Sequence, residues 1–408
     1  MASSLPSLSL TDCFADLPDP RVERTRLHAL SDILVIAICA VLCGAEGGDD
    51  IAEFSEAKRD WLQERLTLEH GLPCADTYRR VQTPIAVCSL QGSFAAGFLR
   101  CRVPSLQGSF AAGFLRWVQA LQEQTKSQVK EQTKSQVIAV DGKTLRHSFD
   151  AASAQQSIHM VSAWALSSRL VLAQAKVEAK INEITAVPAL LSLLDLTGCI
   201  VTADAMICQR AIAAQIVQQG GDYVLALKGN QESLHDDVRR FFEYAATRWF
   251  EATLHQEYFC RDNDHGRIET RRLVQVDLAH LESRWADVQQ QWAGLSSLLM
   301  LQSERQIGQK TTTETRYYLC SLSGDAKKAA HAVRQHWGIE NSVHWVLDVV
   351  FDEDACRIRK DHGPQNFVVL RHMAMNLLRQ EKTNKRGIKA KQKRAGWDNA
   401  FLTKLLTN

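Results

Sequence analysis

Carboxylates occur in this chain at positions where a metal site could form. Asp141 follows the apolar run in VIAVDGK, Asp204 follows the one in IVTADA, and five more carboxylates lie in the stretch HWGIENSVHWVLDVVFDEDACR (336 to 357). Ligands gather at the strand ends of an open α/β sheet, so the two aspartates are predicted to share one rim. Neighbouring carboxylates repel unless a cation neutralises them, and Mg²⁺ prefers such oxygens. A third carboxylate from a helix would complete a two-metal site for phosphoryl transfer.

Other interpretations of the same residues stay open at this point. A single aspartate at a strand end is more often a turn or helix-cap residue, so the metal hypothesis depends on the pair. His336, Glu340 and His344 are spaced i, i+4 and i+8, which places them on one face of a helix. This H-x3-E-x3-H pattern suggests a zinc hydrolase as an alternative, although zincins have the spacing H-E-x-x-H and no separate ligand is visible.

Composition and charge indicate a folded protein with one strongly basic segment. The 408 residues are 45% hydrophobic and 23% charged, which is typical of a globular protein with two or three domains. The formal net charge is only +2. Between Arg379 and Arg394, however, eight lysines and arginines stand against the single acidic residue Glu381. Such a run is either solvated or contacts a nucleic-acid backbone.

The cysteines and the longest apolar run indicate the cellular compartment of the protein. The eleven cysteines are scattered without a C-x-x-C pair, which favours reduced thiols in a cytosolic protein over a zinc ribbon. The longest apolar run, residues 33 to 45, is too short to cross a bilayer and too far from the first residue to be a signal peptide. We therefore expect a buried core helix there, and no contact with a membrane.

The elements that must position the carboxylates follow from hydrophobic periodicity. Residues 11 to 80 have helical spacing, and the pattern changes to strands at Gln136. From there to residue 228 the predicted order is β-β-β-α-β-α-β, which gives a three-layer α/β domain with a mixed sheet. Residues 231 to 325 interrupt this order with a helix and further strands, after which helices are predicted at 324 to 350 and 363 to 380. The strands predicted in the interruption are 267 to 276, 296 to 302 and 315 to 322.

Two segments are duplicated just before the first predicted strand. SLQGSFAAGFLR occurs at 89 to 100 and at 105 to 116, and EQTKSQV occurs at 123 to 129 and at 131 to 137. A solenoid needs several copies of a complete structural unit, and these repeats are too short and too few. They indicate local tandem duplication of coding sequence that lengthens a helix or loop.

Several long motifs resemble one known family. VIAVDGKTLRHS, IVTADAMICQR, DYVLALKGNQ, HGRIETR and the block from HWGIEN to MAMNLLR are similar, in this order, to insertion-sequence DDE transposases of the type that includes the H-repeat-associated proteins. DCFADLPDPR and CGAEGGDDIAEF resemble the helical domain that precedes the catalytic one. The resemblance runs from about Asp12 to the last residues. It implies an RNase H-like mixed sheet flanked by helices, with an N-terminal helical domain and a partly β insertion before the last catalytic helix.

The resemblance also implies the site. Asp141, Asp204 and Glu340 correspond to the catalytic residues that hold two Mg²⁺ or Mn²⁺ ions, with Glu353 as a reserve for the third ligand. His336 and His344 would flank the metal or a bound phosphate. The two tryptophans of this stretch, at 337 and 345, are expected in the core.

One departure from the family affects phosphate binding. Related transposases carry a Tyr, Arg and Lys pattern around the glutamate, but Val333, His336 and Leu347 stand at these positions. Contacts to DNA must therefore come from other cations, and the basic run is the favoured source of sequence-independent backbone contacts. The candidates are Lys228, Arg357, Arg359, Lys360, Lys385, Arg386, Lys391, Lys393 and Arg394.

The sequence thus predicts a DNA transposase that cleaves and transfers strands at insertion-sequence ends. The alternative is an inactive relic that only binds DNA, which the duplications favour and the three intact carboxylates oppose. We expect double-stranded DNA as partner, a homodimer on DNA, and a cytoplasmic bacterial protein associated with the nucleoid when bound. The expected division is a helical domain (1 to 88), a duplicated linker (89 to 135), a catalytic domain (136 to 378, insertion at about 231 to 325) and a basic tail (379 to 408).

Overall fold

The computed structural model describes most of the chain. The duplicated stretch from 89 to 109, and the part of the second duplication at 129 to 135, lie outside the described residues. The described ranges are 12 to 83, 110 to 128, 136 to 149, 156 to 177, 183 to 248, 250, 254 to 264, 266 to 281 and 284 to 407.

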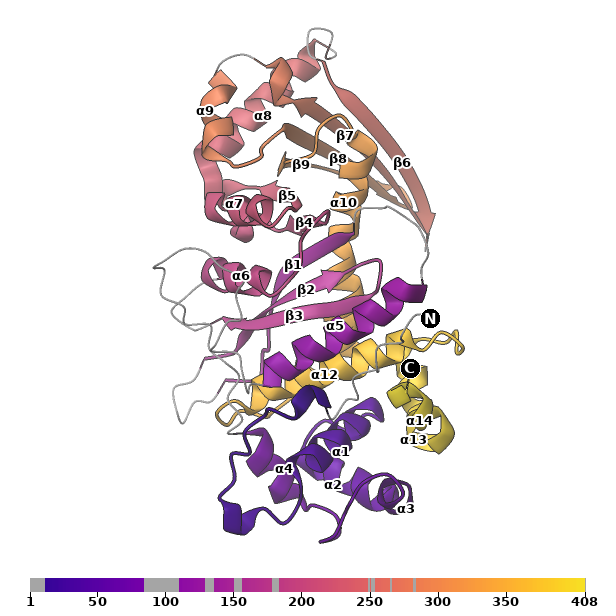
Figure 1. Cartoon of the computed structure of the whole chain (residues 1–408). Coiled ribbons are helices and arrows are strands. Elements are labelled where there is room, and N and C mark those ends of the chain that lie inside the picture. The colour runs from indigo at the N-terminus through magenta and orange to yellow at the C-terminus, as the bar shows by residue number, and fades with distance from the viewer. Residues whose placement is uncertain are drawn as a thin grey trace, which may run out of the picture.

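One nine-stranded sheet organises the molecule, in the order β3-β2-β1-β4-β5-β9-β8-β7-β6 (Figure 1). β1 pairs antiparallel with β2, and β2 antiparallel with β3. β1 pairs parallel with β4, and β4 parallel with β5. This is the RNase H-like mixed sheet that the sequence predicts. The five strands are β1 (Val137–Thr144), β2 (His159–Ala165), β3 (Leu170–Val177), β4 (Ile200–Ala203) and β5 (Asp222–Leu227).

The central strands are apolar because they are covered on both faces. In β1 the first four residues are buried, and all four residues of β4 are buried. Strands of this kind have continuous apolar runs rather than alternation. Asp141 and Asp204 lie where β1 and β4 leave this buried part of the sheet. The connecting helices are α6 (Glu183–Ser192) and α7 (Arg210–Gln218).

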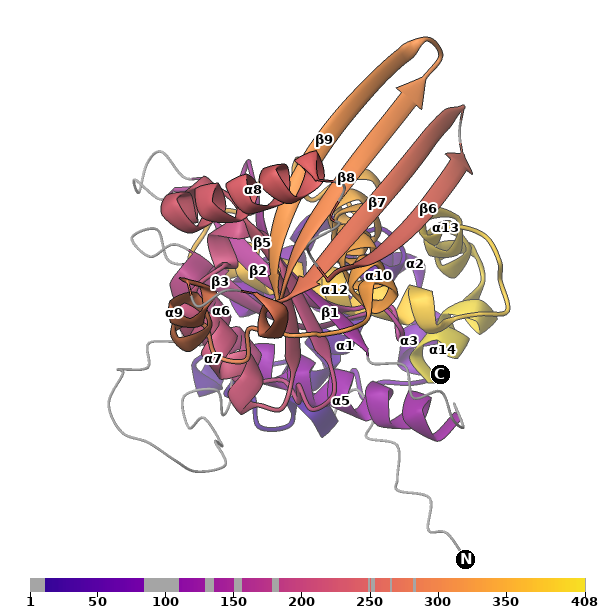
Figure 2. The same cartoon turned by 90° about the horizontal axis from the view of Figure 1, so that it is seen from above.

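The insertion adds four strands to the same sheet. β9 pairs antiparallel with β5, from Val224 with Cys320 to Leu227 with Tyr317. Figure 2 shows these strands projecting from the body, and we call β6 to β9 the blade. The projecting half of β9 is exposed, whereas the half beside β5 is buried. The blade consists of β6 (Gln256–Asp264), β7 (Arg267–Asp277), β8 (Ser297–Ile307) and β9 (Lys310–Cys320), with α8 (Glu232–Thr247) and α9 (Arg284–Gln291) in its connections.

A long helix, α12 (Gly363–Gln380), joins the sheet to the N-terminal helices (Figure 1). It packs against β3, against α5 (Phe110–Gln128) and against α1 (Leu30–Leu42). Nine of the thirteen residues of α1 are buried, which confirms the predicted core helix. None of the described helices is long and apolar enough to cross a membrane. The other N-terminal helices are α2 (Gly48–Ala57), α3 (Arg59–Gln63) and α4 (Ala75–Gln82).

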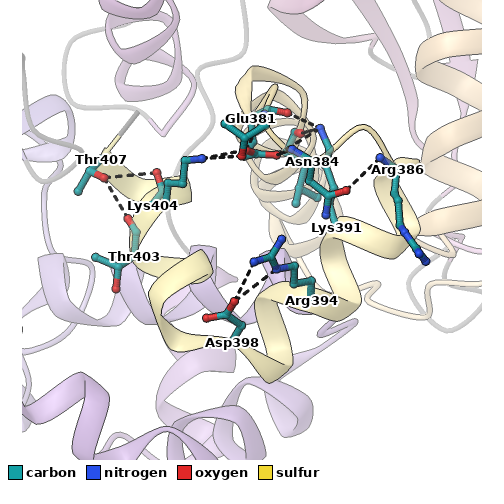
Figure 3. A network of polar contacts seen from close by, with 11 residues as sticks. Glu381, Asn384, Arg386, Lys391, Arg394, Asp398, Thr403, Lys404 and Thr407 are labelled. Carbon is teal, nitrogen blue, oxygen red and sulfur yellow. Dashed lines mark hydrogen bonds and ion pairs between the residues drawn. The ribbon is translucent and has the colours of Figure 1, made fainter.

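The basic C-terminal run folds into α13 (Ile388–Trp397) and α14 (Asn399–Thr407), around the buried carboxylate of Glu381 (Figure 3). Lys404 Nζ lies 3.1 Å from Glu381 Oε1, and Lys391 donates to the carbonyls of Leu378 and Glu381. Burial opposes ionisation of Glu381, but hydrogen bonds from Thr383 and the Lys404 contact outweigh it and lower the pKa of Glu381 to about 2. Part of the basic run therefore stabilises the fold.

Candidate active site

The two aspartates come next after the last parallel pair of β1 and β4, which is Val140 with Ala203, so they lie at the same edge of this pairing. Asp204 follows the end of β4, but Asp141 does not end its strand as predicted, because β1 continues to Thr144 beside β2. Both aspartates line a cavity of about 250 Å³, and Glu340 lines the same cavity. The structure therefore brings together the three carboxylates that the sequence analysis selects. Other residues of the cavity wall include Thr202, Lys228, Arg316, Trp337 and His336.

Glu340 reaches the cavity from an irregular turn of helix. α10 (Ala326–Ile339) packs on β1 and β4, and α11 (Trp345–Val350) continues the same rod. Between them, Glu340–His344 forms a π-helical turn, a feature that occurs frequently at functional sites. The wider turn still leaves Glu340 and His344 in contact, since His344 Nδ1 lies 2.8 Å from Glu340 Oε2.

The two histidines of this segment have different partners. His336 Nδ1 lies 3.2 Å from Thr202 Oγ1 on β4, and burial lowers the pKa of His336, which favours its neutral form. His344 is buried, and its Nδ1 lies 2.8 Å from Glu340 Oε2 and 3.7 Å from Asp141 Oδ2. Only His344 therefore bridges two of the candidate carboxylates.

A group able to hold a metal ion consists of Asp141, Glu340 and His344. One ligand atom from each lies within 4.8 Å of the other two. Burial raises the pKa of Asp141 to about 6, although His344 and the backbone N–H of Gly142 act in the opposite direction. Negative charge at this position is thus incompletely compensated by the protein, and a divalent cation would supply the compensation. The sequence analysis places His344 beside the metal, and the structure adds its ring nitrogen to the possible ligands.

Asp204 stands apart from that group and has a cation of its own. Its Oδ1 lies 3.1 Å from Lys228 Nζ, and both side chains are about half exposed. Burial alone would raise the pKa of Asp204, but the N–H of Ala205 and the ammonium of Lys228 outweigh this and lower it. A second ion between Asp141 and Asp204 would have to compete with Lys228, which is free to move because it is exposed.

Three of the four remaining carboxylates of the stretch surround Lys143, two residues after Asp141 on β1. Lys143 Nζ lies 2.7 Å from Asp348, 3.3 Å from Glu353 and 2.9 Å from Asp354. Burial opposes the charge of Lys143, but these carboxylates outweigh it and raise its pKa. Glu353 is 1% exposed at its side chain and lies outside the cavity wall. Its reserve role as a metal ligand is not supported by this arrangement.

The cations proposed for DNA fall into three environments. Lys228 lines the cavity, whereas Arg357, Arg359 and Lys360 do not. In the C-terminal run, four of the five candidates are exposed, but Lys391 is buried and bonded to backbone carbonyls, an arrangement that does not favour its predicted contact with DNA. The exposed four are Lys385, Arg386, Lys393 and Arg394, of which Arg394 pairs with Asp398.

The structure also corrects the prediction for the tryptophans. Trp337 is 41% exposed and Trp345 is 56% exposed, so neither is a core residue. Arg316 on β9 lines the cavity as well, and nothing in the local sequence signals this. Its position depends on the pairing of β9 with β5, a contact between segments almost a hundred residues apart.

Comparison with known proteins gives consistent results. A family model described as Transposase DDE domain matches residues 132–377, and one described as DDE_Tnp_1-associated matches residues 11–96. The chain is 37% identical over 403 residues to "Putative transposase YncI" of Escherichia coli O157:H7, covering 98% of this chain and 95% of the relative. It is 37% identical over 394 residues to "H repeat-associated putative transposase YhhI" of Escherichia coli K12, covering 96% and 95%.

A solved structure with a weaker likeness is a cryo-EM structure of a piggyBac transposase synaptic complex with hairpin DNA. The identity is 10%, the TM-score is 0.41, and the match covers 98% of this chain and 82% of that chain. The family model of the DDE domain covers more than half of the chain, and the H-repeat-associated relatives match it over nearly the whole length. The protein therefore belongs to the DDE transposase family, together with the H-repeat-associated transposases.

Proposed function

We propose that this protein is an active DNA transposase that cleaves DNA at the ends of an insertion sequence and joins the freed ends to target DNA. The observation that carries this proposal is the convergence of Asp141, Asp204 and Glu340 on one cavity from β1, β4 and the π-helical turn. Family membership supports the same reaction. Asp141, Asp204 and Glu340 are the proposed catalytic residues.

The residues of the cavity fit a divalent cation. Carboxylate oxygens suit Mg²⁺ and Mn²⁺, and the raised pKa of Asp141 reflects charge that the protein leaves uncompensated. Asp141, Asp204 and Glu340 would hold two ions of Mg²⁺ or Mn²⁺. When bound, such ions would supply activation of water and stabilisation of the charge that develops in a phosphoryl transfer.

The side chains around the three carboxylates orient them and compensate part of their charge. His344 donates to Glu340 when its Nδ1 is protonated, which orients the carboxylate toward Asp141. Lys228 neutralises Asp204, and its side chain is 56% exposed, so its ammonium is also accessible to a phosphate oxygen of DNA. His336 is held to Thr202 and stays neutral, so it forms part of the cavity wall without adding positive charge.

Double-stranded DNA is the proposed partner, bound as element ends and as target. The exposed cations of the C-terminal run, including Lys385 and Lys393, would contact the backbone without regard to sequence. We further propose that the chain acts as a homodimer on DNA. The helices of residues 12 to 83 and the blade lie on opposite sides of the central sheet (Figure 1), and we assign recognition of the element ends to them.

The test is cleavage of a DNA fragment that carries the terminal repeats flanking the coding sequence, with Mg²⁺, Mn²⁺ or EDTA. Wild type should cut at the repeat ends only with a metal ion, and Asp204→Asn should bind without cutting. Wild-type protein that binds these ends and does not cut under any condition would establish the alternative, an inactive DNA-binding relic. The duplications at 89 to 137 are the observation that favours this alternative.

A further inference from the structure

A second and larger hollow adjoins the catalytic cavity. It has a volume of about 630 Å³ and lies between α10 and one face of the blade, and we call it the blade groove. Figure 2 shows the blade extending from the body with α10 beside its base. Arg316, Val333 and Trp337 line both hollows. The two hollows therefore meet at these three residues, and Trp337 lies at the junction.

Trp337 is a fixed aromatic surface at this junction. It lies three residues before Glu340, and 41% of it is exposed. The guanidinium of Arg316 lies over the indole, with Cζ 4.7 Å from the ring centroid. Arg316 is itself held by Glu314, to which Nε and Nη2 donate at 2.7 and 2.8 Å. The ring is thus held on one side by a restrained cation and leaves apolar surface open to a ligand.

Arginines line the groove beyond Trp337. Arg267 and Arg305 both lie within 3.4 Å of Glu269, and Arg271 contacts the same carboxylate. In total five arginines and four carboxylates line the groove. This near balance makes bulk attraction small. Three of the arginines share Glu269, so positive charge exceeds negative charge there and a phosphate could bind to it. Trp337 offers an aromatic surface for a base where the groove meets the catalytic cavity.

We propose that the blade groove binds the DNA strand that continues past the scissile phosphate, and that a base of this strand stacks on Trp337. The proposal rests on the proposed function, because it takes the cavity of Asp141 and Glu340 as the place of cleavage. A base suits this position better than a sugar or phosphate, since every base has a flat face and stacks on an aromatic side chain without sequence preference. Trp337 is thus a binding residue for the flanking strand.

The test combines a protein variant with a DNA variant. DNA carrying the terminal repeat is extended beyond the element end, and a single abasic site is moved along the extension one nucleotide at a time. Affinity is measured by fluorescence anisotropy in EDTA. Wild type should lose about 5- to 100-fold at one abasic position, which is the range of one base stacked on an aromatic side chain.

On intact DNA, Trp337→Ala should bind more weakly than wild type by the same factor. An abasic site at that position should not weaken its binding further, because the variant has no indole for the base to stack on. Trp337→Phe keeps an aromatic face and should retain most of the affinity, which separates stacking from a folding defect. Trp345→Ala is the matched control, because Trp345 is exposed on the next helix and lines neither hollow. It should behave as wild type throughout.

The outcomes separate this inference from the proposed function. If Trp337→Ala binds intact DNA as tightly as wild type, or suffers the same abasic penalty, the inference is overturned while cleavage by wild type is unaffected. If wild type shows the penalty at one position and Trp337→Ala does not, but no metal supports cleavage, the inference stands and the proposed activity fails. Absence of any DNA binding by wild type overturns both.

Discussion

Asp141 and Lys143 are two residues apart on β1, and each lies in a different group of carboxylates contributed by the stretch from 336 to 357. The group at Asp141 contains Glu340 and His344. The group at Lys143 contains Glu353 with Asp348 and Asp354, and Arg371 lies 3.8 Å from Glu353. Both groups are built from β1 and the stretch from 336 to 357. Lys143 and Arg371 lie beside the carboxylates of the second group, whereas the first group contains no lysine or arginine.

This difference separates a functional group from a structural one. A carboxylate that is buried with lysine and arginine beside it has its charge compensated by the fold. Among the described residues no lysine or arginine pairs with Asp141, and its pKa is raised because burial makes ionisation unfavourable in this position. Uncompensated charge lowers stability, and it persists where a ligand compensates it instead. The contrast shows that functional carboxylates are identified better by the absence of a paired lysine or arginine than by the number of acidic residues in a segment.

The largest effect is expected when the uncompensated group is altered. Glu340→Gln should reduce cleavage by about a thousandfold or more, because a metal clamp supplies several kcal/mol of transition-state stabilisation and each 1.4 kcal/mol is about tenfold. Single-turnover cleavage of the repeat-end fragment measures this. Asp352→Asn is the matched control, since Asp352 is an exposed acidic residue of the same stretch outside both groups. Normal cleavage by Glu340→Gln would remove Glu340 from the site.

The second prediction concerns the compensated group. Lys143→Met should lower the free energy of unfolding by about 3 kcal/mol or more, because it leaves the carboxylate of Glu353 buried without its nearest cation. Urea denaturation measures the change. Arg146→Ala serves as control, because the Arg146 side chain is 77% exposed and its guanidinium forms an exposed pair with Asp354, so about 1 kcal/mol or less is expected. Equal stability of Lys143→Met and wild type would contradict the division into two groups.

Replacing Asp141 by Asn is expected to raise the free energy of unfolding in metal-free buffer. Burial raises the pKa of Asp141 from 3.8 to about 6, so the folded chain binds this proton more tightly than the unfolded chain. The free energy of unfolding should therefore fall as the pH rises from about 4 to about 6, by up to about 3 kcal/mol. Asp141→Asn should remove this loss and be more stable than wild type above pH 6 in metal-free buffer.

Urea denaturation at pH 5 and pH 7.5, in EDTA and in Mn²⁺, tests the prediction for Asp141. Mn²⁺ should raise the free energy of unfolding of wild type, because an ion that binds only the folded state stabilises it. Asp141→Asn lacks a carboxylate of the site, so its free energy of unfolding should not change with Mn²⁺. A variant less stable than wild type at pH 7.5 without metal would show that the charge of Asp141 is compensated by the protein.

The smallest effects are expected among the cations of the C-terminal run, where the same contrast recurs. Lys393→Gln changes an exposed residue and should reduce the salt dependence of DNA binding by about one phosphate contact, with normal stability. Lys391→Met should instead lower stability by about 1 to 3 kcal/mol, because Lys391 bonds two backbone carbonyls beside the buried Glu381. Salt titrations of DNA affinity and urea denaturation measure both variants. A loss of stability in Lys393→Gln, or a reduced salt dependence with normal stability in Lys391→Met, would contradict this assignment.

Local patterns predicted much of the fold. The order of β1 to β5 follows from apolar runs bounded by polar residues, and the helix predicted at 363 to 380 coincides with α12. β6 was not predicted, because its sequence QEYFCRDND is mostly polar and lies on the edge of the sheet. The exposure of Trp337 and Trp345 was also missed, since an amphipathic stretch rich in aromatic residues resembles a core helix.

The sequence by itself determined the family, the order of β1 to β5 along the chain, and the position of Asp141 and Asp204 directly after the apolar runs of β1 and β4. These follow from short-range periodicity and from motifs that lie within single elements. Only the tertiary structure decided that Glu340 faces the cavity while Glu353 is enclosed with Lys143, that Lys391 is buried, and that the insertion extends the sheet. The reason is that burial and charge compensation depend on partners distant along the chain, and periodicity within one segment carries no information about them.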